Sequence, residues 1–479
     1  MNFANSLDHL GQTLSQKGGQ LRKAELKLAI VGHTNTGKTS LLRTLLHNDH
    51  FGEVQNAPGT TRHVEGARLT LSDTHGVQWY DTPGLEDSIA LLEYIDRLSL
   101  QNGQRLDPVA SIEKFLASPE SQGRFEQEAR VLKRLMACDA GLYVVDVRDP
   151  VLPRHKDELA VLNRCGKPLI PILNFLHSEH NYLTQWKDNF ARLGIHVSIE
   201  FDTVAPALDG EVQLYQKLAL VLEEHKTILH QLAAQTDQER RQRRQQACRR
   251  LAELLINVCA FRRRSQPDSA QAAEVWQTMQ EEVRRAEKDF IHDLLRLYQF
   301  DTAIYQDDPL LLQEGRWGMD LFSQEAIKDM GIQLSKGIAT GATAGMAIDL
   351  FTGGLSLGAA TLIGGLAGGL WQGADKWGSR LMGHLQGYRE LTVDEAVLRH
   401  LALRGLGLIK RLESRGHAAQ TPLQQVALED SPLKDQSLPE SLSEARGSTH
   451  WSALNPDFRT SSRRQEAIQS LTDYLQKQL

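Results

Sequence analysis

The sequence predicts a doubly wound α/β sheet over residues 24–224, followed by an all-α region that includes a glycine-rich helical hairpin. Two observations predict the sheet: strand-like apolar runs alternate with amphipathic helical segments, and a glycine-rich turn joins the first run to the first helix. A third observation predicts the change of class, because strand signals stop near residue 224 while long helical patterns continue.

The elements of the first region follow from hydrophobic patterning in chain order. Apolar or alternating runs predict strands at 26–31, 64–71, 77–80, 140–147, 168–173 and 196–201. Helical periodicity predicts helices at 40–46, 152–164, 181–193 and 213–224. The stretch 89–133 is charged and helical in pattern, and we expect an insertion at 101–123 within it.

The turn between the first strand and helix has the spacing of a phosphate-binding loop, as in P-loop NTPases. Glycines let successive N–H groups point at phosphate oxygens, and the helix N-terminus adds further donors. We expect Lys38 to bridge the β- and γ-phosphates and Thr39 to bind Mg²⁺. The alternative is a glycine-rich loop that matches by chance. The expected nucleotide-binding residues of this segment are Gly32, His33, Thr34, Asn35, Thr36, Gly37, Lys38, Thr39 and Ser40.

Two later motifs stand in the order that a nucleotide site requires. A polar segment ends in Gly59-Thr60-Thr61-Arg62-His63, and the strand at 77–80 runs into Asp81-Thr82-Pro83-Gly84. An aspartate at the end of an apolar strand suits a second Mg²⁺ contact, and Gly84 could approach a γ-phosphate. By itself Asp-Thr-Pro-Gly is a good turn. Behind a phosphate loop it supports nucleotide binding.

Together these motifs resemble the TrmE–Era–EngA group of P-loop GTPases. The resemblance covers residues 24–220 and implies GTP or GDP as ligand, Mg²⁺ as cofactor, and hydrolysis of the γ-phosphate. It implies that Thr39, Thr61 and Asp81 hold the metal, with Thr60 as the substitute for Thr61. It further implies that Lys38, Thr61 and Gly84 contribute to catalysis, and the bound nucleotide would make the protein a molecular switch.

Two residues modify the expected catalysis. Leu85 stands where Ras-like enzymes place a glutamine that orients the attacking water, so the resemblance is to GTPases with a hydrophobic residue there. Asn35 matches an asparagine that in some relatives helps to hold K⁺, which could supply positive charge to the transition state. Alternatively, Asn35 is present because asparagine tolerates a tight turn.

The expected base-reading motif departs from the family pattern. The family places Asn-Lys-x-Asp after the strand at 168–173, whereas this chain has Asn174-Phe175-Leu176-His177. Asn174 matches, but the carboxylate that accepts from guanine N1–H and the exocyclic amine is absent. Glu179 could replace it. The fifth motif is placed at 202–206, so base specificity stays open between guanine and other nucleotides.

Long helices dominate residues 225–320. Helical patterns at 229–261 and 270–298 predict an antiparallel hairpin joined near Pro267. The arginine-dense run 240–250 could grip RNA or anionic lipid, as a ribosome-associated assembly factor would. The alternative, which we favour, is a solvated helix face balanced by nearby glutamates.

Residues 321–415 contain a glycine-rich stretch at 337–378, in which glycines recur every fourth residue. Such a glycine zipper lets two helices approach closely. One hypothesis is a hairpin that inserts conditionally into a membrane; the other is a buried hairpin, because Asp349 is costly in lipid. Further on, we expect a helix at 392–411, a disordered linker at 416–457 and a terminal helix at 462–479.

Composition sets the remaining expectations. The chain of 479 residues has a net charge of −6 and four cysteines without C-x-x-C pairing, and residues 1–23 are polar. These features favour a cytoplasmic protein, which would be peripheral at the inner face of the cell membrane if 337–378 bind lipid. A switch or slow hydrolase is the first hypothesis. A ribosome- or RNA-associated GTPase and a nucleotide-dependent scaffold with little hydrolysis are the alternatives.

Overall fold

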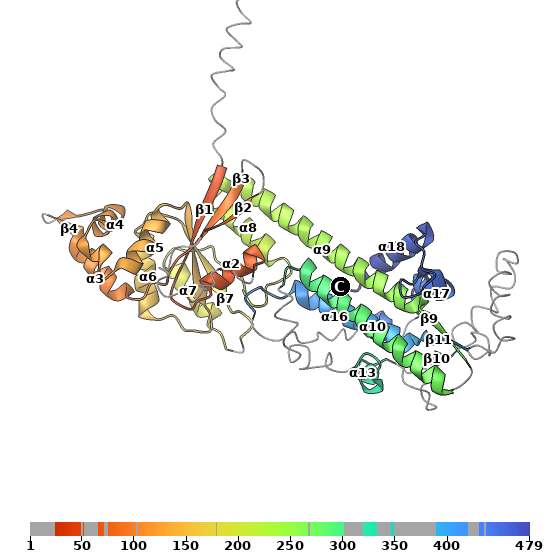
Figure 1. Cartoon of the computed structure of the whole chain (residues 1–479). Helices are drawn as coiled ribbons and strands as arrows, with labels where there is room; N and C mark the ends of the chain where they lie inside the picture. The colour runs from red at the N-terminus through yellow and green to blue at the C-terminus, as the bar shows by residue number, and fades with distance from the viewer. Residues whose placement is uncertain are drawn as a thin grey trace, which may run out of the picture. The chain divides into compact units, whose positions relative to one another are not determined.

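The computed structural model describes residues 24–48, 51, 66–70, 75–101, 104–178, 180–266, 269–300, 320–332, 346–348, 389–419, 431–434 and 437–479 (Figure 1). The chain divides into two compact units. Unit 1 comprises Met1–Arg240 and Ser414–Gln420, and unit 2 comprises Arg241–Glu413 and Thr421–Leu479.

Unit 1 is built on a six-stranded sheet in the order β2-β3-β1-β6-β7-β8. Its strands are β1 (Ala24–Val31), β2 (Gly66–Thr70), β3 (His75–Asp81), β6 (Ala140–Asp146), β7 (Leu169–Asn174) and β8 (Ile199–Glu200). All neighbours are parallel except β2 and β3, which form an antiparallel pair at one edge. The predicted doubly wound fold is therefore confirmed, although β8 is shorter than expected.

Helices cover both faces of this sheet, as Figure 1 shows. On one face, α2 (Lys38–Leu46), α8 (Gly210–Val221) and the first turns of α9 (Lys226–Ala260) bury leucines against β1 and β6. The other face is covered by α5 (Glu126–Met136), α6 (Pro153–Asn163) and α7 (Leu183–Arg192), and α3 (Ser88–Ser99) and α4 (Pro108–Leu116) join the same hydrophobic cluster farther from the strands. Because both faces are buried, the central strands are apolar throughout rather than alternating.

The stretch predicted as an insertion, 101–123, folds onto the α3 side of unit 1. It contains most of the hairpin β4 (Leu100–Gln101) and β5 (Gln104–Arg105), then α4 and η1 (Pro119–Gln122). Phe115 and Phe125 pack edge-to-face with ring centroids 6.2 Å apart, and Tyr94 contacts both rings. This aromatic cluster attaches the stretch to the sheet layer through α3 and α5.

Unit 2 is mainly helical and has one hydrophobic core. Into it pack the rest of α9, α10 (Ser269–Leu297), α13 (Gln324–Asp329), α16 (Glu395–Glu413), α17 (Glu440–Gly447) and α18 (Ser462–Gln476). Within this unit, α9 and α10 are linked by a salt bridge from Arg250 Nη1 to Asp293 Oδ2 at 2.5 Å. The expected helices at 229–261, 270–298, 392–411 and 462–479 are present.

Unit 2 also has a small sheet that hydrophobic patterning did not predict. It pairs β10 (Met346–Ile348), β11 (Arg389–Val393) and β9 (Arg262–Ser265) in that order, all antiparallel. The sequence did not predict strand β9 because Arg262, Arg263 and Arg264 directly follow the arginine-dense helix and share its composition. Arg262 is instead nearly buried, and its Nη1 is 3.0 Å from Glu390 Oε2 on β11. A strand with this composition exists because its charges are paired within the fold.

The segment expected to be a disordered linker also differs in the structure. Residues 437–457 include α17 and η5 (Thr449–Trp451), and η4 (Pro432–Lys434) lies just before them. Leu442, Ala445 and Trp451 are buried in the core of unit 2. The sequence did not predict these helices because Ser, Pro and charged residues surround the few apolar ones. Burial of these few apolar side chains is enough to order short helices.

Within the glycine-rich stretch 337–378 the structure describes only β10, and Met346–Ile348 form a strand where the sequence predicted a helix. The rest of the predicted helical hairpin lies outside the described residues and stays a prediction. Among the helices of the described residues, none has the length and apolar character needed to cross a bilayer. The four cysteines Cys138, Cys165, Cys248 and Cys259 are buried and free.

Close packing of α16 on α9 yields a first prediction. A Cβ at Gly405 would lie 2.4 Å from Leu251 Cδ1, whereas one at Gly447 would have no neighbour within 4 Å. Both substitutions by alanine improve helix propensity, but overpacking typically costs about 1–3 kcal/mol. We expect Gly405→Ala to be less stable than the matched control Gly447→Ala by about that amount in urea unfolding. Equal midpoints for the two variants would contradict this packing.

Candidate functional site

The phosphate loop follows β1 and has the backbone conformation that its glycines permit. Gly32 has φ +140° and Gly37 has φ +92°, and Asn35 between them also has a positive φ of 64°. A Cβ at Gly32 would lie 2.5 Å from the Val144 carbonyl oxygen, and one at Gly37 would lie 2.3 Å from Asn174 Nδ2. Space and backbone angle together explain why glycine stands at both positions.

Lys38 is the first residue of α2, and its ammonium group turns back into the loop. Nζ donates to the carbonyl oxygens of Gly32 at 3.1 Å and His33 at 2.5 Å. Burial lowers the pKa of Lys38 to about 8, although Asp81 and Glu158 oppose this shift. The fold thus holds a desolvated cation beside the loop, which favours the arrival of an anion.

Thr39 and Asp81 form the expected metal-binding pair. Thr39 Oγ1 donates to Asp81 Oδ2 at 2.6 Å, which joins the start of α2 to the end of β3. A hydroxyl and a carboxylate are hard oxygen donors that suit Mg²⁺, an ion bound in proteins by one or two such groups together with substrate phosphates. These residues therefore fit a magnesium ion.

Gly84, in the loop after β3, lies close to Thr34 of the phosphate loop. A Cβ there would lie 2.2 Å from Thr34 Oγ1 and 2.7 Å from the Thr34 nitrogen. The loop that contains Gly84 is also bound to α5, because Gln127 Nε2 donates to the Gly84 carbonyl at 2.7 Å. Leu85 is fully buried against the α3–α7 layer. The contact with Gln127 was not foreseen, because it is non-local in sequence.

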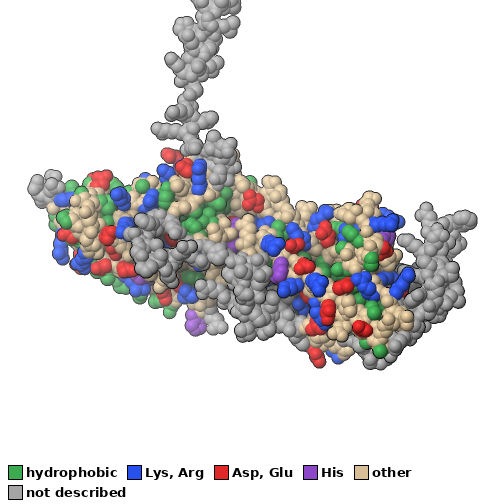
Figure 2. All heavy atoms as spheres, viewed as in Figure 1, with side chains coloured by type: hydrophobic (Ala, Val, Ile, Leu, Met, Phe, Trp, Pro, Cys, Tyr) green, Lys and Arg blue, Asp and Glu red, His purple; other side chains and the backbone are tan. Residues whose placement is uncertain are grey.

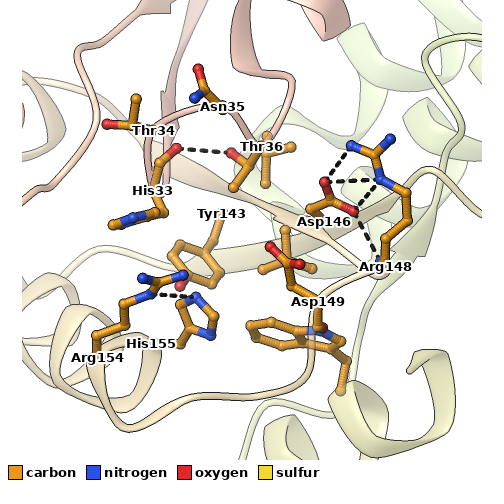
Figure 3. A pocket seen from close by; sticks show the side chains of 13 residues that line it. His33, Thr34, Asn35, Thr36, Tyr143, Asp146, Arg148, Asp149, Arg154 and His155 are labelled. Atoms are coloured by element: carbon orange, nitrogen blue, oxygen red, sulfur yellow. Dashed lines mark hydrogen bonds and ion pairs between the residues drawn. The ribbon is translucent and has the colours of Figure 1, made fainter. Parts of the chain in front are cut away.

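A pocket of about 270 Å³ opens on the side of the phosphate loop that faces β6 and α6 (Figure 3). Thr34 and Asn35 lie at one rim of this pocket, and Arg154 and His155 lie at the other. Asn35 is exposed, and its amide makes no hydrogen bond to any residue that the structure describes. This amide is therefore available to a ligand or an ion at the loop.

A buried acid supports the loop behind this pocket. Glu158 on α6 is fully buried, and its carboxylate accepts from Tyr143 Oη at 2.7 Å and pairs with His33 Nδ1 at 2.7 Å. Burial also lowers the pKa of His155, whose Nδ1 accepts the Leu152 N–H at the start of α6. Sequence reasoning missed Glu158; its signal is a lone acid on an apolar helix face.

Asn174 joins three loops. Its side chain is fully buried, with Nδ2 donating to the Thr36 carbonyl at 3.0 Å. Its Oδ1 accepts the N–H groups of Phe175 and Thr203, both at 2.9 Å. The phosphate loop, the loop after β7 and the loop after β8 are thereby fixed together.

Phe175, which follows Asn174, stands where related motifs have lysine, and it makes different contacts. Phe175 has a positive φ of 62°, and its ring faces Gly37. The Arg148 guanidinium lies 3.9 Å above the same ring and pairs with the Asp146 carboxylate at 2.6 Å. Both residues belong to loops at the C-terminal edge of the sheet, where α/β folds bind ligands.

A segment from late in the chain also contacts this edge within unit 1. The Gly416 N–H donates to the Val204 carbonyl at 2.9 Å, and a Cβ at Gly416 would lie 1.9 Å from the Thr203 carbonyl oxygen. The His417 and His47 rings are 5.0 Å apart. The loop after β8 is therefore held both by Asn174 and by residues more than 200 positions away.

The structure brings most of the predicted site residues to one edge. Thr60, Thr61 and Glu179 lie outside the described residues, so their expected roles stay predictions. Described and gathered around the loop after β1 are Gly32, His33, Thr34, Asn35, Thr36, Gly37, Lys38, Thr39, Ser40, Asp81, Gly84 and Asn174.

The arginine run on α9 is largely neutralised within each unit. Arg240 pairs with Asp237, Arg244 with Glu413, Arg249 with Glu253 and Arg250 with Asp293. Figure 2 shows Lys/Arg and Asp/Glu side chains interspersed on the visible face. This pairing supports a solvated, charge-balanced helix.

The depressed pKa of Lys38 predicts a pH-dependent stability. Unfolded Lys38 has a pKa of 10.5, so between about pH 8 and 10.5 the folded state binds fewer protons and wild-type stability rises with pH. We expect nucleotide-free Lys38→Met to be more stable than wild type at pH 7 by about 1–3 kcal/mol, with the difference shrinking toward pH 10.5.

Thermal unfolding at several pH values measures this effect. The control is Lys156→Met on the exposed face of α6, which should show no such trend. A difference for Lys38→Met that is constant with pH would contradict a buried ammonium group.

Comparisons with known proteins place these features in families. Residues 187–473, more than half of the chain, match the family described as "Domain of unknown function (DUF3482)". Residues 27–175 match the family described as "50S ribosome-binding GTPase". The two matches together include both units of the structure.

Curated relatives resemble the first part of the chain. The tRNA modification GTPase MnmE of Synechococcus sp. (strain JA-2-3B'a(2-13)) is 37% identical over 159 residues, which are 32% of this chain and 29% of that protein. GTPase Der of Coxiella burnetii (strain Dugway 5J108-111) is 26% identical over 123 residues, 26% of this chain and 27% of that protein. The chain thus spans less than a third of the length of the relatives it matches.

Among solved structures, Aquifex aeolicus Era bound to GDP.AlF4⁻ aligns with 43% of this chain and 56% of its own, at 19% identity and a TM-score of 0.27. The G domain of the T. maritima FeoB transporter aligns at 17% identity, with 41% and 97% coverage and a TM-score of 0.24. From the family matches, the chain belongs to the DUF3482 family, and ahead of the residues that match this family it carries a GTPase domain that is homologous to the G domains of MnmE and Der.

Proposed function

We propose that this protein binds GTP with Mg²⁺ and hydrolyses it slowly, and that the bound nucleotide switches the state of the loops around the site. The observation that carries the proposal is the convergence of Lys38, the Thr39–Asp81 pair and Gly84 on one phosphate loop. The match of residues 27–175 to a GTPase family supports the same chemistry.

Each group has a role in this proposal. Lys38 leaves the loop carbonyls and binds the β- and γ-phosphates, which stabilises the positive charge that burial disfavours. Thr39 and Asp81 hold Mg²⁺, and Thr61, or Thr60 in its place, completes the metal site. A magnesium ion held there would supply positive charge that offsets the charge developing on the phosphate oxygens.

Gly84 supplies the switch in this scheme. Its N–H would report the presence of the γ-phosphate. A side chain at this position has no room beside Thr34, which explains why the residue is glycine. Since Gln127 holds the Gly84 carbonyl, movement of the loop would be passed to α5. The state of the nucleotide could thus reach the surface of unit 1.

Catalysis needs a group other than Leu85. The side chain of Leu85 is buried and apolar, so it cannot orient an attacking water. We propose that the exposed amide of Asn35 helps to hold K⁺ beside the phosphates, where it would stabilise transition-state charge. If no cation binds, the protein is the nucleotide-dependent scaffold with little hydrolysis.

Single-turnover hydrolysis in K⁺ and Na⁺ buffers tests this role of Asn35. We expect hydrolysis at least about tenfold faster in K⁺, because each 1.36 kcal/mol of transition-state stabilisation is a factor of ten. Asn35→Ala should lose the K⁺ dependence, while the control Asn163→Ala at the far end of α6 should keep it.

Equal rates in the two salts for wild type would contradict the role of the cation. Undetectable hydrolysis despite tight GTP binding that requires Lys38 would favour the scaffold.

Membrane association is a further proposal that rests on the sequence of residues 337–378, with the protein starting in the cytoplasm. In flotation with anionic liposomes, we expect nucleotide-dependent recovery of the full chain in the lipid fraction. Replacing both Leu362 and Ile363 by glutamate should abolish it, since a charge within an apolar segment is costly in lipid. Failure to float in every nucleotide state would remove this proposal.

The ribosome- or RNA-associated alternative is favoured by the description of the family that residues 27–175 match. The paired arginines of the run at 240–250 speak against this run as the RNA-binding surface. If RNA binds elsewhere, its affinity should fall steeply with salt while neutralising this run leaves it unchanged.

A further inference from the structure

The loop after β7 presents a histidine where base recognition is expected. His177 follows Asn174 by three residues, and its side chain is 70% exposed. Its Nδ1 lies 3.1 Å from Asp202 Oδ2, and its backbone N–H donates to the same oxygen at 3.3 Å. The ring is thus oriented by Asp202 while Nε2 points away from the contact.

Asp202 itself is too occupied to contact a base. It is 4% exposed, and its Oδ1 accepts the N–H groups of Val204 at 2.9 Å and Ala205 at 3.0 Å. Burial by itself would raise the pKa of Asp202, but hydrogen bonds from Ala205, His177 and Val204 lower it overall. Asp202 is therefore an ionised acceptor whose oxygens all have donors, and it acts as a positioning residue.

An ionised carboxylate at Nδ1 determines the tautomer of the neutral ring. Because the carboxylate can only accept, Nδ1 carries the hydrogen and Nε2 keeps its lone pair. His177 consequently offers one hydrogen-bond acceptor at the exposed edge of the ring. A carboxylate at this position would offer two.

The loop that carries this acceptor is joined to the phosphate loop. Asn174 fixes the loops after β7 and β8 beside the phosphate loop, at the carboxyl edge of the sheet where ligands bind. On the opposite, β3 side, Thr39 and Asp81 occupy that edge. In the binding mode that we consider, a nucleotide with its phosphates at Lys38 would extend its base toward His177.

We propose that His177, held by Asp202, reads the base through its Nε2 as the single acceptor for a purine N1–H. The ligand class is nucleotides of 6-oxopurines, which carry that N1–H, whereas adenine presents a bare N1 acceptor. His177 offers no second acceptor for the 2-amino group of guanine, so we expect hypoxanthine nucleotides to bind as well as guanine nucleotides. This inference rests on the proposed nucleotide-binding function.

The neighbouring backbone adds no further specificity. The N–H groups of Thr203, Val204 and Ala205 already donate to Asn174 and Asp202. Base discrimination by the described residues of the loops after β7 and β8 therefore depends on one hydrogen bond, which typically changes affinity by about three- to tenfold. This is weaker than the discrimination that two acceptors give.

Titration of the full chain with GDP, IDP, N1-methyl-GDP and ADP in Mg²⁺ tests the proposal. We expect GDP and IDP to bind within about threefold of each other, and N1-methyl-GDP and ADP to bind about tenfold more weakly. GDP binding more than about tenfold tighter than IDP would overturn the proposal, because it would require a reader of the 2-amino group.

Variants separate the acceptor from the fold. His177→Ala should bring GDP and ADP to within about threefold while phosphate binding remains. In Asp202→Asn, the amide NH₂ should donate to His177 Nδ1, so that the ring hydrogen moves to Nε2. His177 would then offer a donor, and the preference should shift toward ADP, whose N1 accepts. The control is His196→Asn, an exposed residue that precedes β8 and so lies at the amino-terminal end of this strand, away from the ligand loops. It should keep the wild-type order of nucleotide affinities. An unchanged GDP preference in both His177→Ala and Asp202→Asn would overturn the proposal.

Failure of the proposed function gives a different result. If binding of every nucleotide is absent, or persists in Lys38→Ala, both the proposed function and this inference fall. If all four nucleotides bind equally and lose affinity in Lys38→Ala, nucleotide binding stands and the inference alone falls.

Discussion

The arrangement of this site depends on the buried side-chain amide of Asn174. Its donor and acceptor groups are divided among the Thr36 carbonyl and the N–H groups of Phe175 and Thr203. An unpaired amide in this position would cost about 1–3 kcal/mol, so the three loops are stabilised as a set rather than individually. The phosphate loop is thereby joined to the loops at which a base is expected.

A second feature is that the fold holds a desolvated positive charge at the phosphate loop. Lys38 bonds to loop carbonyls, and Asn35 and Gly37 hold left-handed backbone angles beside it. Local strain and a desolvated ammonium group are unfavourable in the free protein, and phosphate binding relieves the second of these. The free energy that the fold loses by burying this ammonium group then contributes to the affinity for phosphate.

The family pattern is kept in the phosphate chemistry and altered in the base-reading loop. Asn174 keeps its structural contacts, whereas Phe175 packs between Gly37 and Arg148, and His177 takes a carboxylate partner from the loop after β8. In the proposed base site, the carboxylate thus lies behind His177 rather than at the fourth position of the motif. Such a change preserves the loop geometry while reducing the number of acceptors that face the ligand.

The sequence by itself determined the α/β fold, the phosphate loop, Asp81, Gly84 and the long helices, because periodicity and tight turns are local properties. Only the tertiary structure decided that Glu158 supports His33, that Gln127 holds Gly84 and that Asp202 orients His177. It also decided that Arg262–Ser265 is a strand and that α17 is ordered, since paired charges and a few buried anchors can override composition. These contacts join residues far apart in the chain, and no local pattern encodes them.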